Sequence, residues 1–219
     1  MAKGLKSGDV LRFPLGCGWG FAYAKYQHIL GLDGNTSYPD LLRIFAYRSP
    51  AAEVLDVARL QGYLLSPTLW AGRLPTMHLG RWQVVGALPI LPEEGFLPDF
   101  RWGEWAINDR MRVPHPPPPG ATLYAHRCLD PAPRWETALA NVAHLEYLGA
   151  RPDEFIEYRT TLAFMLREGA TPADYLDASD LTFRYEMGVL QDRPFPDALP
   201  PHLYGRARQP GDPGFVSLA

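Results

Sequence analysis

The chain has 219 residues, of which 47% are hydrophobic and 21% are charged, and its formal net charge is −3. This composition is typical of a folded globular protein and excludes general intrinsic disorder. The sequence holds no apolar run of about 18 residues, and its first residues lack the apolar core of a signal peptide. We therefore expect a cytoplasmic protein that neither spans nor crosses a membrane.

Two strands joined by a glycine turn are predicted near the start of the chain. Apolar residues alternate over residues 10–15, and the return strand over residues 19–26 has one bulky face and one face of glycine and alanine. The sequence Gly-Cys-Gly at residues 16–18 supplies the turn, because glycine adopts positive φ without a Cβ clash. A face of glycine and alanine allows a second layer to approach closely.

Three further strands are expected over residues 41–48, 80–91 and 95–107. The first of them is apolar with little alternation, which indicates a strand covered on both faces. Prolines favour edge positions for the other two strands. Residues 49–63 are predicted to be helical, because Ser49 can act as N-cap and a proline follows at the first helical position.

The second half of the chain is predicted to be helical. Residues 132–150 and 151–170 place apolar side chains at helical spacing, and residues 169–179 add a short third helical segment. A proline-rich stretch at residues 113–120 favours polyproline II and separates these helices from the strands.

These elements predict one α+β domain over residues 1–190. A bent antiparallel sheet, partly barrel-like, is expected over residues 8–113, with two to three helices from residues 131–178 packed on it. Residues 191–219 are rich in proline and small residues, which predicts a tail that is either ordered by contact or frayed.

The glycine turn is a poor candidate for a reactive site. A phosphate-binding loop leads from a strand into a helix whose N-terminal amides face the anion, but here a second strand follows. Cys17 lies in the turn, and the histidines have no spacing to it that is typical of a nucleophile and its base. A cysteine that fills space in a tight turn is the simpler interpretation.

Metal and cofactor sites are not expected either. The two cysteines, Cys17 and Cys128, are too few for a disulfide framework or a cysteine-based zinc site, so both are predicted to be free thiols. The nearest pair of ligand types, His144 and Glu146, is two residues apart on a predicted helix and would point to different faces. We expect His144 on the helix surface, and we expect neither catalytic residues nor a cofactor nor a metal.

Adjacent acidic residues, such as Glu93 and Glu94, diverge on any regular element and do not form a catalytic pair by themselves. Two carboxylates from distant positions could still meet in the fold, as in glycosidases. A small hydrolase-type enzyme with a carboxylate site or a Cys17-based site therefore stays open as an alternative function.

The net charge hides an acidic second half. Residues 151–180 carry three arginines against seven acidic residues. An acidic surface attracts a basic protein and disfavours nucleic acid, whose phosphates need the opposite charge. Trp102 and Trp105 flank Glu104 in a composition typical of interface hot spots. The simpler roles are a solvated helix face and a cover for the sheet. The candidate partner-binding residues are Asp153, Glu154, Glu157, Asp174, Asp177, Trp102 and Trp105.

Four stretches follow one another in a characteristic order between residues 8 and 105. The first, GDVLRFPLGCGWGFAYAKY, has a Gly-Asp start, a strand that ends in Pro-Leu, a glycine turn and a second strand with Gly-Phe. The others are LLRIFAYR, GRWQVVGALPIL and FLPDFRWG. In this order the chain resembles the immunity protein 26 family of bacterial polymorphic toxin systems. It departs from the family pattern in having CGWG in place of a polar turn, and in its proline-rich connector and tail.

The resemblance implies a non-enzymatic α+β protein that binds and neutralises a cognate toxin in the cytoplasm of the producing cell. It implies no catalytic residues, and the toxin-binding residues do not carry over, because such pairs diversify their interfaces. From the charge pattern we expect the acidic helices to cover a basic site on the toxin, such as that of a nuclease. A non-catalytic adaptor that offers the glycine and alanine face or the polyproline stretch to a partner is a further alternative.

Overall fold

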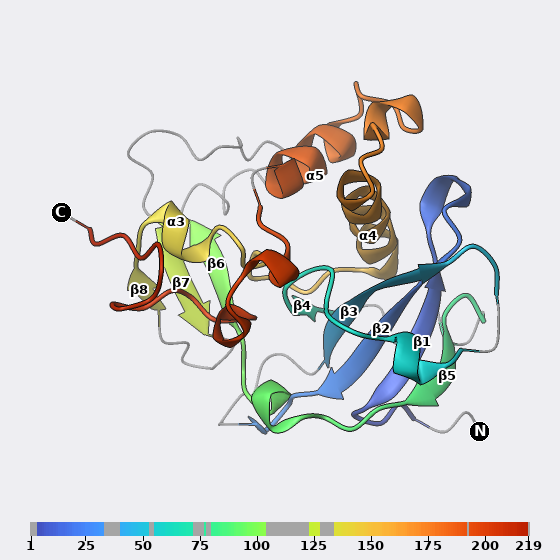
Figure 1. Cartoon of the computed structure of the whole chain (residues 1–219), viewed down its shortest axis with the longest axis horizontal. Helices are drawn as coiled ribbons and strands as arrows, with labels where there is room; N and C mark the ends of the chain where they lie inside the picture. The colour runs from blue at the N-terminus through green and yellow to red at the C-terminus, as the bar shows by residue number, and fades with distance from the viewer. Residues whose placement is uncertain are drawn as a thin grey trace.

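The computed structural model describes residues 4–32, 40–52, 55–71, 77, 80–103, 123–127, 134–191 and 193–218. Within these residues the chain forms a five-stranded antiparallel sheet, a three-stranded antiparallel sheet and three α-helices (Figure 1). The predicted α+β class is confirmed. The large sheet is open and does not close into a barrel.

The large sheet begins with the predicted hairpin. Strands β1 (Asp9–Pro14), β2 (Phe21–His28) and β3 (Asp40–Ser49) form a meander, with β4 (Thr68–Leu69) beside β3 and β5 (Gln83–Ala87) beside β1. The register shifts at Val10/Leu11 between β1 and β5 and at Ala22/Ala24 between β2 and β3, with the extra residues on β5 and β3, and such bulges bend a sheet. Strand β5 is an edge strand, as the neighbouring prolines predict.

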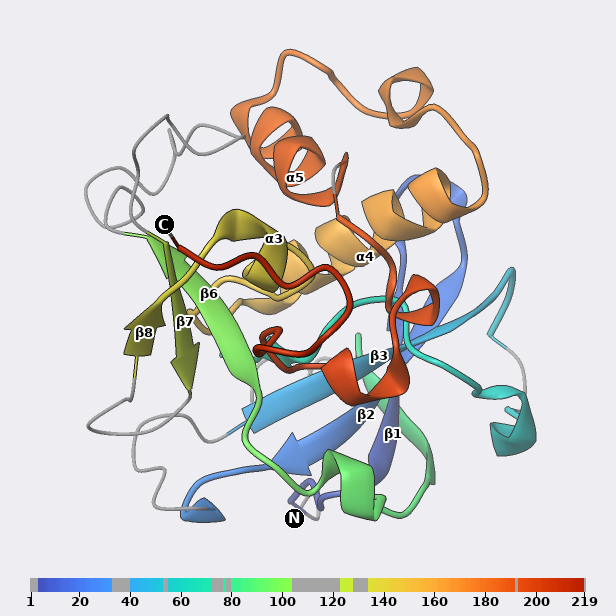
Figure 2. The ribbon, with the colours of Figure 1, turned by 60° about the vertical axis from the view of Figure 1, so that its left-hand side comes forward.

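Helix α4 (Asp153–Arg167) crosses one face of the large sheet, and α5 (Leu181–Gln191) lies outside α4 (Figures 1 and 2). Ala22 and Ala24 of β2 are fully buried in the same cluster as Leu162 of α4. The alanine face of β2 therefore admits the helical layer, as predicted, and is not available to an external partner. None of the helices in the described part of the chain has both the length and the apolar character that a membrane span needs.

The prediction of a helix over residues 49–63 is wrong. The described part contains only a short 3₁₀ turn, Val57–Arg59, which is capped by the carboxylate of Asp56. The backbone after this turn pairs with β3, because Ala46 N–H donates to Gly62 O at 3.1 Å and Leu64 N–H to Ile44 O at 2.8 Å. The apolar side chains of this segment cover the second face of the sheet, so tertiary contacts override the helical spacing.

The small sheet consists of β6 (Asp99–Gly103), β7 (Leu123–Arg127) and β8 (Arg134–Glu136). Residues 132–150 were expected to form a helix, and this prediction is also wrong, because the segment enters β8 and has only the four-residue helix α3 (Leu139–Val142). Residues 146–148 instead run along β6: Arg101 N–H donates to Glu146 O at 2.8 Å and Leu148 N–H to Arg101 O at 3.0 Å.

Two features at the end of the chain complete the fold. Helix α5 was not predicted from the sequence, whereas α4 and the short 3₁₀ turn Pro172–Asp174 agree with the expected helical segments.

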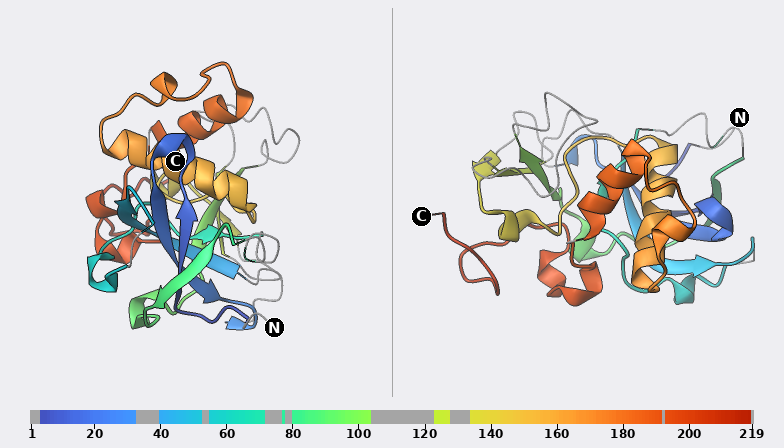
Figure 3. Two further views of the ribbon diagram at one scale, coloured as in Figure 1. Left: turned by 90° about the vertical axis from the view of Figure 1, so that its right-hand side faces the viewer. Right: turned by 90° about the horizontal axis from the view of Figure 1, so that it is seen from above.

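The C-terminal segment, residues 193–218, runs from the helical layer to the small sheet (Figure 3). Its residues Leu203 and Ala207 are 1% and 2% exposed, so the described tail is ordered by contact.

Gly20, immediately before β2, provides a test of the hairpin geometry. Gly20 has φ +86°, and a Cβ there would lie 2.0 Å from the carbonyl oxygen of Ser49. We predict that Gly20→Ala lowers the free energy of unfolding by about 2–4 kcal/mol, because left-handed strain and a backbone clash add together. Urea denaturation of both proteins measures this difference.

Gly18→Ala is the matched control, because Gly18 has φ +74° with no atom within 4 Å of its added Cβ. It should cost about 1–2 kcal/mol from backbone strain alone. Equal losses for the two variants would contradict the close approach of β2 and β3.

Candidate functional site

Two of the predicted contact residues on α4 point into the protein. Asp153 accepts a hydrogen bond from Trp70 Nε1 at 2.5 Å, and Glu157 accepts one from Trp82 Nε1 at 2.6 Å and pairs with Arg81. The two carboxyl residues are 4% and 7% exposed, and burial raises the pKa of each. They hold the stacked indoles of Trp70 and Trp82, whose centroids are 5.1 Å apart, so their visible role is structural.

The other predicted contact residues are distributed over separate places. Glu154, in the first turn of α4, is exposed, and its Oε1 lies 3.7 Å from Arg81 Nη1. Asp174 and Asp177 are exposed on the loop between α4 and α5. Trp102 is half-buried in β6. Trp105, with its neighbour Glu104, lies outside the described residues.

We define the acidic ridge as the exposed aspartates and the exposed tyrosine of the α4–α5 loop, together with the first residue of α5. It lies at the outer edge of the helical layer (Figure 2). Two large side chains project from it, with Tyr175 50% and Leu181 55% exposed. Its members are Asp174, Tyr175, Asp177, Asp180 and Leu181.

Local hydrogen bonds fix the carboxylates of the ridge. Asp177 accepts from the hydroxyl of Ser179 at 2.7 Å and from its backbone N–H at 2.8 Å, and these bonds lower the pKa of Asp177. Asp180 accepts from the backbone N–H of Thr182 at 2.6 Å and caps α5. The ridge therefore presents oriented negative charge beside exposed apolar side chains.

Residues in and next to the glycine turn contact Tyr175 of the ridge. The ring of Trp19 makes an edge contact with Tyr175 at a centroid distance of 5.8 Å, and Arg48 lies 4.7 Å above the Trp19 ring. The free, exposed thiol of Cys17 donates to the carbonyl oxygen of Tyr175 at 3.5 Å. A carbonyl oxygen cannot act as a general base, so this contact positions the loop and does not activate the thiol. Cys128 lies outside the described residues.

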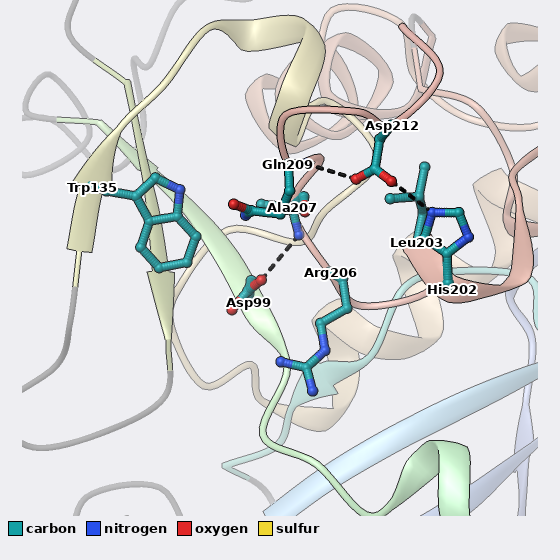
Figure 4. A pocket seen from close by; sticks show the side chains of 8 residues that line it. All are labelled: Asp99, Trp135, His202, Leu203, Arg206, Ala207, Gln209 and Asp212. Atoms are coloured by element: carbon teal, nitrogen blue, oxygen red, sulfur yellow. Dashed lines mark hydrogen bonds and ion pairs between the residues drawn. The ribbon is translucent and has the colours of Figure 1, made fainter. Parts of the chain in front are cut away.

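A cavity of about 520 Å³ lies between the small sheet and the C-terminal segment (Figure 4). In its wall, His202 Nε2 and Asp212 Oδ1 are 2.9 Å apart, and Asp212 also accepts from the backbone N–H of Gln209 at 2.7 Å. These hydrogen bonds, the backbone one first, lower the pKa of Asp212. The lining residues are Asp99, Trp135, His202, Leu203, Arg206, Ala207, Gln209 and Asp212.

The histidine–carboxylate pair can orient an imidazole for general-base chemistry on water. The described lining residues include no serine, threonine or cysteine, so they offer no side-chain nucleophile of the hydroxyl or thiol type. No sequence pattern pointed to this pair. His202 and Asp212 are ten residues apart in a proline-rich segment, and no helical or strand periodicity places them together.

A second cavity of about 380 Å³ shares His202 and Arg206 with the first. Its walls include the rings of Tyr63 and Tyr204, stacked at a centroid distance of 4.6 Å. Glu94, another lining residue, forms an ion pair with Lys25 at 2.6 Å and accepts a hydrogen bond from Tyr63. Burial alone would raise the pKa of Glu94, but its hydrogen bonds from Lys25, Tyr63 and Leu91 outweigh burial and lower it.

His144 is buried and does not lie on a helix surface, so the sequence prediction for it is wrong. It is 1% exposed, and its Nε2 is 2.7 Å from the carbonyl oxygen of Arg206. Burial lowers the pKa of His144 to about 4, which keeps the imidazole neutral at physiological pH. The Nε2–H therefore donates to Arg206 and holds the C-terminal segment against the small sheet.

Glu146 connects α4 to the C-terminal segment through a buried ion network. Its carboxylate pairs with Arg159 of α4 and with Arg193 Nη1 at 2.6 Å. Arg159 Nε also donates to Glu186 of α5 at 2.5 Å. Burial would raise the pKa of Glu146, but the surrounding arginines, Arg159 first, lower it to about 2. These acids are structural and do not belong to an exposed surface.

No protein-family model, curated protein or solved structure matches the chain. Among the described residues, no group of three or more histidine, cysteine, aspartate or glutamate side chains is arranged to hold a metal ion.

The buried imidazole makes stability depend on pH. The folded-state pKa of His144, about 4, lies below its ordinary value of 6.5, so only the unfolded chain takes up this proton as the pH falls between these values. We predict that between pH 6.5 and 4.5 the wild type loses about 2–3 kcal/mol more of its free energy of unfolding than His144→Gln does. Urea titrations of both proteins at each pH measure the difference, and parallel pH profiles would contradict it.

The ion network should be far more sensitive than an exposed ion pair on the same helix. Arg159→Met leaves Glu146 and Glu186 buried without this partner, which should cost about 3–5 kcal/mol. Arg167→Met, which removes the exposed pair with Asp197, should cost about 0–1 kcal/mol. Chemical denaturation of the two variants tests this order, and a reversed order would refute it.

Proposed function

We propose that this chain is an immunity protein, which binds a cognate protein toxin in the cytoplasm and neutralises it by covering a basic site. The acidic ridge is the observation that carries the proposal. It combines three exposed carboxylates, two of them fixed by local hydrogen bonds, with the exposed side chains of Tyr175 and Leu181. Aspartate charges steer a basic partner, and a tyrosine in the middle of such a patch is a typical anchor.

The ridge also rests on a rigid base, which favours binding without reorganisation. Trp19 and Cys17 support Tyr175, and Glu168 at the end of α4 forms an ion pair with Arg48 of β3 at 2.6 Å. Preorganised contact residues lose less conformational entropy when a partner binds. The α+β fold agrees with the class that the family resemblance implies.

The test uses variants that remove charge but keep the local hydrogen-bond acceptors. We predict that Asp174→Asn, Asp177→Asn and Asp180→Asn together slow association with the toxin by about tenfold at low salt and flatten its salt dependence. The probe is a toxin domain that a gene neighbouring this one would encode, and stopped-flow association at several salt concentrations measures the rate. Co-expression with that domain measures protection of the cell.

The matched control removes three charges elsewhere, through Glu93→Gln, Glu136→Gln and Asp56→Asn. It changes the net charge equally but leaves the ridge intact, so its association rate should stay close to that of the wild type. An unchanged on-rate for the ridge variant at low salt would refute the role of the ridge. No protection by the wild-type chain would refute the immunity function itself.

A hydrolase is the second candidate, and the pair of His202 and Asp212 in the cavity of Figure 4 favours it. In this role His202 would take a proton from a water molecule that attacks the substrate. The two functions separate cleanly: a His202→Gln protein that still protects cells fully would exclude hydrolysis as the basis of protection. Full protection by Cys17→Ala would exclude the thiol.

A further inference from the structure

A cluster of four arginines lies where α4, α5 and the small sheet meet, and only two carboxylates pair with it. Glu146 pairs with Arg159 and Arg193, and Glu186 pairs with Arg159. The other two arginines, Arg101 and Arg151, have no ion pair within the described residues. The cluster therefore carries more positive than negative charge.

Arg101 shows the consequence of this imbalance. It is 4% exposed, and its Nε and Nη2 atoms are buried without a hydrogen-bond partner. Its guanidinium lies 4.2 Å from the ring centroid of Tyr147, which is a weak substitute for a carboxylate. Burial, together with the neighbouring positive charges, lowers the pKa of Arg101 to about 10. An additional anion near this cluster would relieve that cost.

Arg151 connects the cluster to the surface. Its Nε atom is buried without a partner, and the residue lines both a small inner cavity and an open cleft. The inner cavity, of about 10 Å³, also borders Arg159, whose Nη2 is unpartnered, and Glu186, whose Oε1 is unpartnered. That volume suits a single water molecule, so a larger anion must lie in the outer cleft.

The outer cleft has the size and lining of a small-ligand site. Its volume is about 270 Å³, and it lies between the first turns of α4 and α5. The positive dipole ends of both helices therefore lie near it. Phe155 and Leu181 give it apolar walls, and Thr182 and Tyr185 contribute hydroxyl groups. The lining residues are Ala150, Arg151, Pro152, Phe155, Leu181, Thr182 and Tyr185.

We propose that this cleft binds the carboxylate of a small organic acid, with the carboxylate on the guanidinium of Arg151 and the apolar body between Phe155 and Leu181. The planar guanidinium matches a carboxylate in a bidentate pair. The apolar walls favour a ligand with a short hydrocarbon body over a bare inorganic ion. The nearby acids have other partners: Asp153 is bonded to Trp70, Glu154 lies 3.7 Å from Arg81, and Asp180 is bonded to the Thr182 amide.

The test compares three anions at constant ionic strength: isovalerate, acetate and inorganic phosphate, each against chloride. Isovalerate should raise the melting temperature of the full chain most, in a saturable manner, because it binds only the folded state. Calorimetric titration measures its affinity directly. Phosphate binding more tightly than isovalerate, or no saturable binding of any of the three, would overturn the proposal.

Variants then locate the site. Arg151→Gln should weaken isovalerate binding by at least about tenfold, because one charge-assisted bidentate pair is lost. Arg184→Gln is the control, since Arg184 is exposed on α5 and does not line the cleft, and it should bind as the wild type does. Equal weakening in both variants, or unchanged binding in Arg151→Gln, would overturn the assignment.

A gain-of-stability variant provides an independent readout that a damaged fold cannot imitate. Leu181→Glu places a carboxylate at the mouth of the cleft, beside two helix N-termini and Arg151. It should raise the melting temperature by about 2 °C relative to Leu181→Gln and abolish isovalerate binding. A lower melting temperature for Leu181→Glu than for Leu181→Gln would overturn the proposal. The test uses no toxin, so its outcome is independent of the proposed immunity function.

Discussion

The salt bridges of Arg159 hold the main layers of this protein together. The side chain projects from the middle of α4 and reaches Glu186 on α5 and Glu146 beside β6, while Arg193 approaches the same Glu146 from the C-terminal segment. Four parts of the chain thus depend on one buried guanidinium and its two carboxylates. Such a network adds little net stability over an apolar core, but each member left alone is costly, so it specifies one arrangement of the elements.

The same constraint explains why the cavities lie where they do. The C-terminal segment has little regular structure, and it is held by Arg193, by the bond from His144 to Arg206 O, and by the bond from Ala207 N–H to Asp99 at 3.0 Å. These contacts bring His202, Arg206 and Asp212 to the small sheet. A proline-rich tail thereby becomes the wall of two cavities, because polar contacts at a few points hold it and no continuous hydrophobic stripe is needed.

Local patterns predicted the elements whose contacts are local. Alternation in residues 10–15 and the glycines of the turn were enough for the first hairpin, and helical spacing was enough for α4. Residues 49–63 and 132–150 have similar spacing, but their backbones bond to β3 and β6, which a helical pattern cannot reveal. Helix α5 was missed because its sequence includes Thr182, Gly188 and Val189, which are weak helix formers, and its place depends on the distant Arg159.

The acidic residues of the candidate site were also predicted only as far as local sequence allows. Charge counting predicted an acidic surface, but it could not separate Asp153 and Glu157, which turn inward, from Asp174 and Asp177, which stay exposed. The difference depends on Trp70 and Trp82, about eighty residues earlier in the chain, whose indole N–H groups need acceptors inside the core. The acidic residues of this region therefore have two different physical roles. One group of carboxylates satisfies buried donors, and the other supplies the exposed negative charge on which partner recognition would depend.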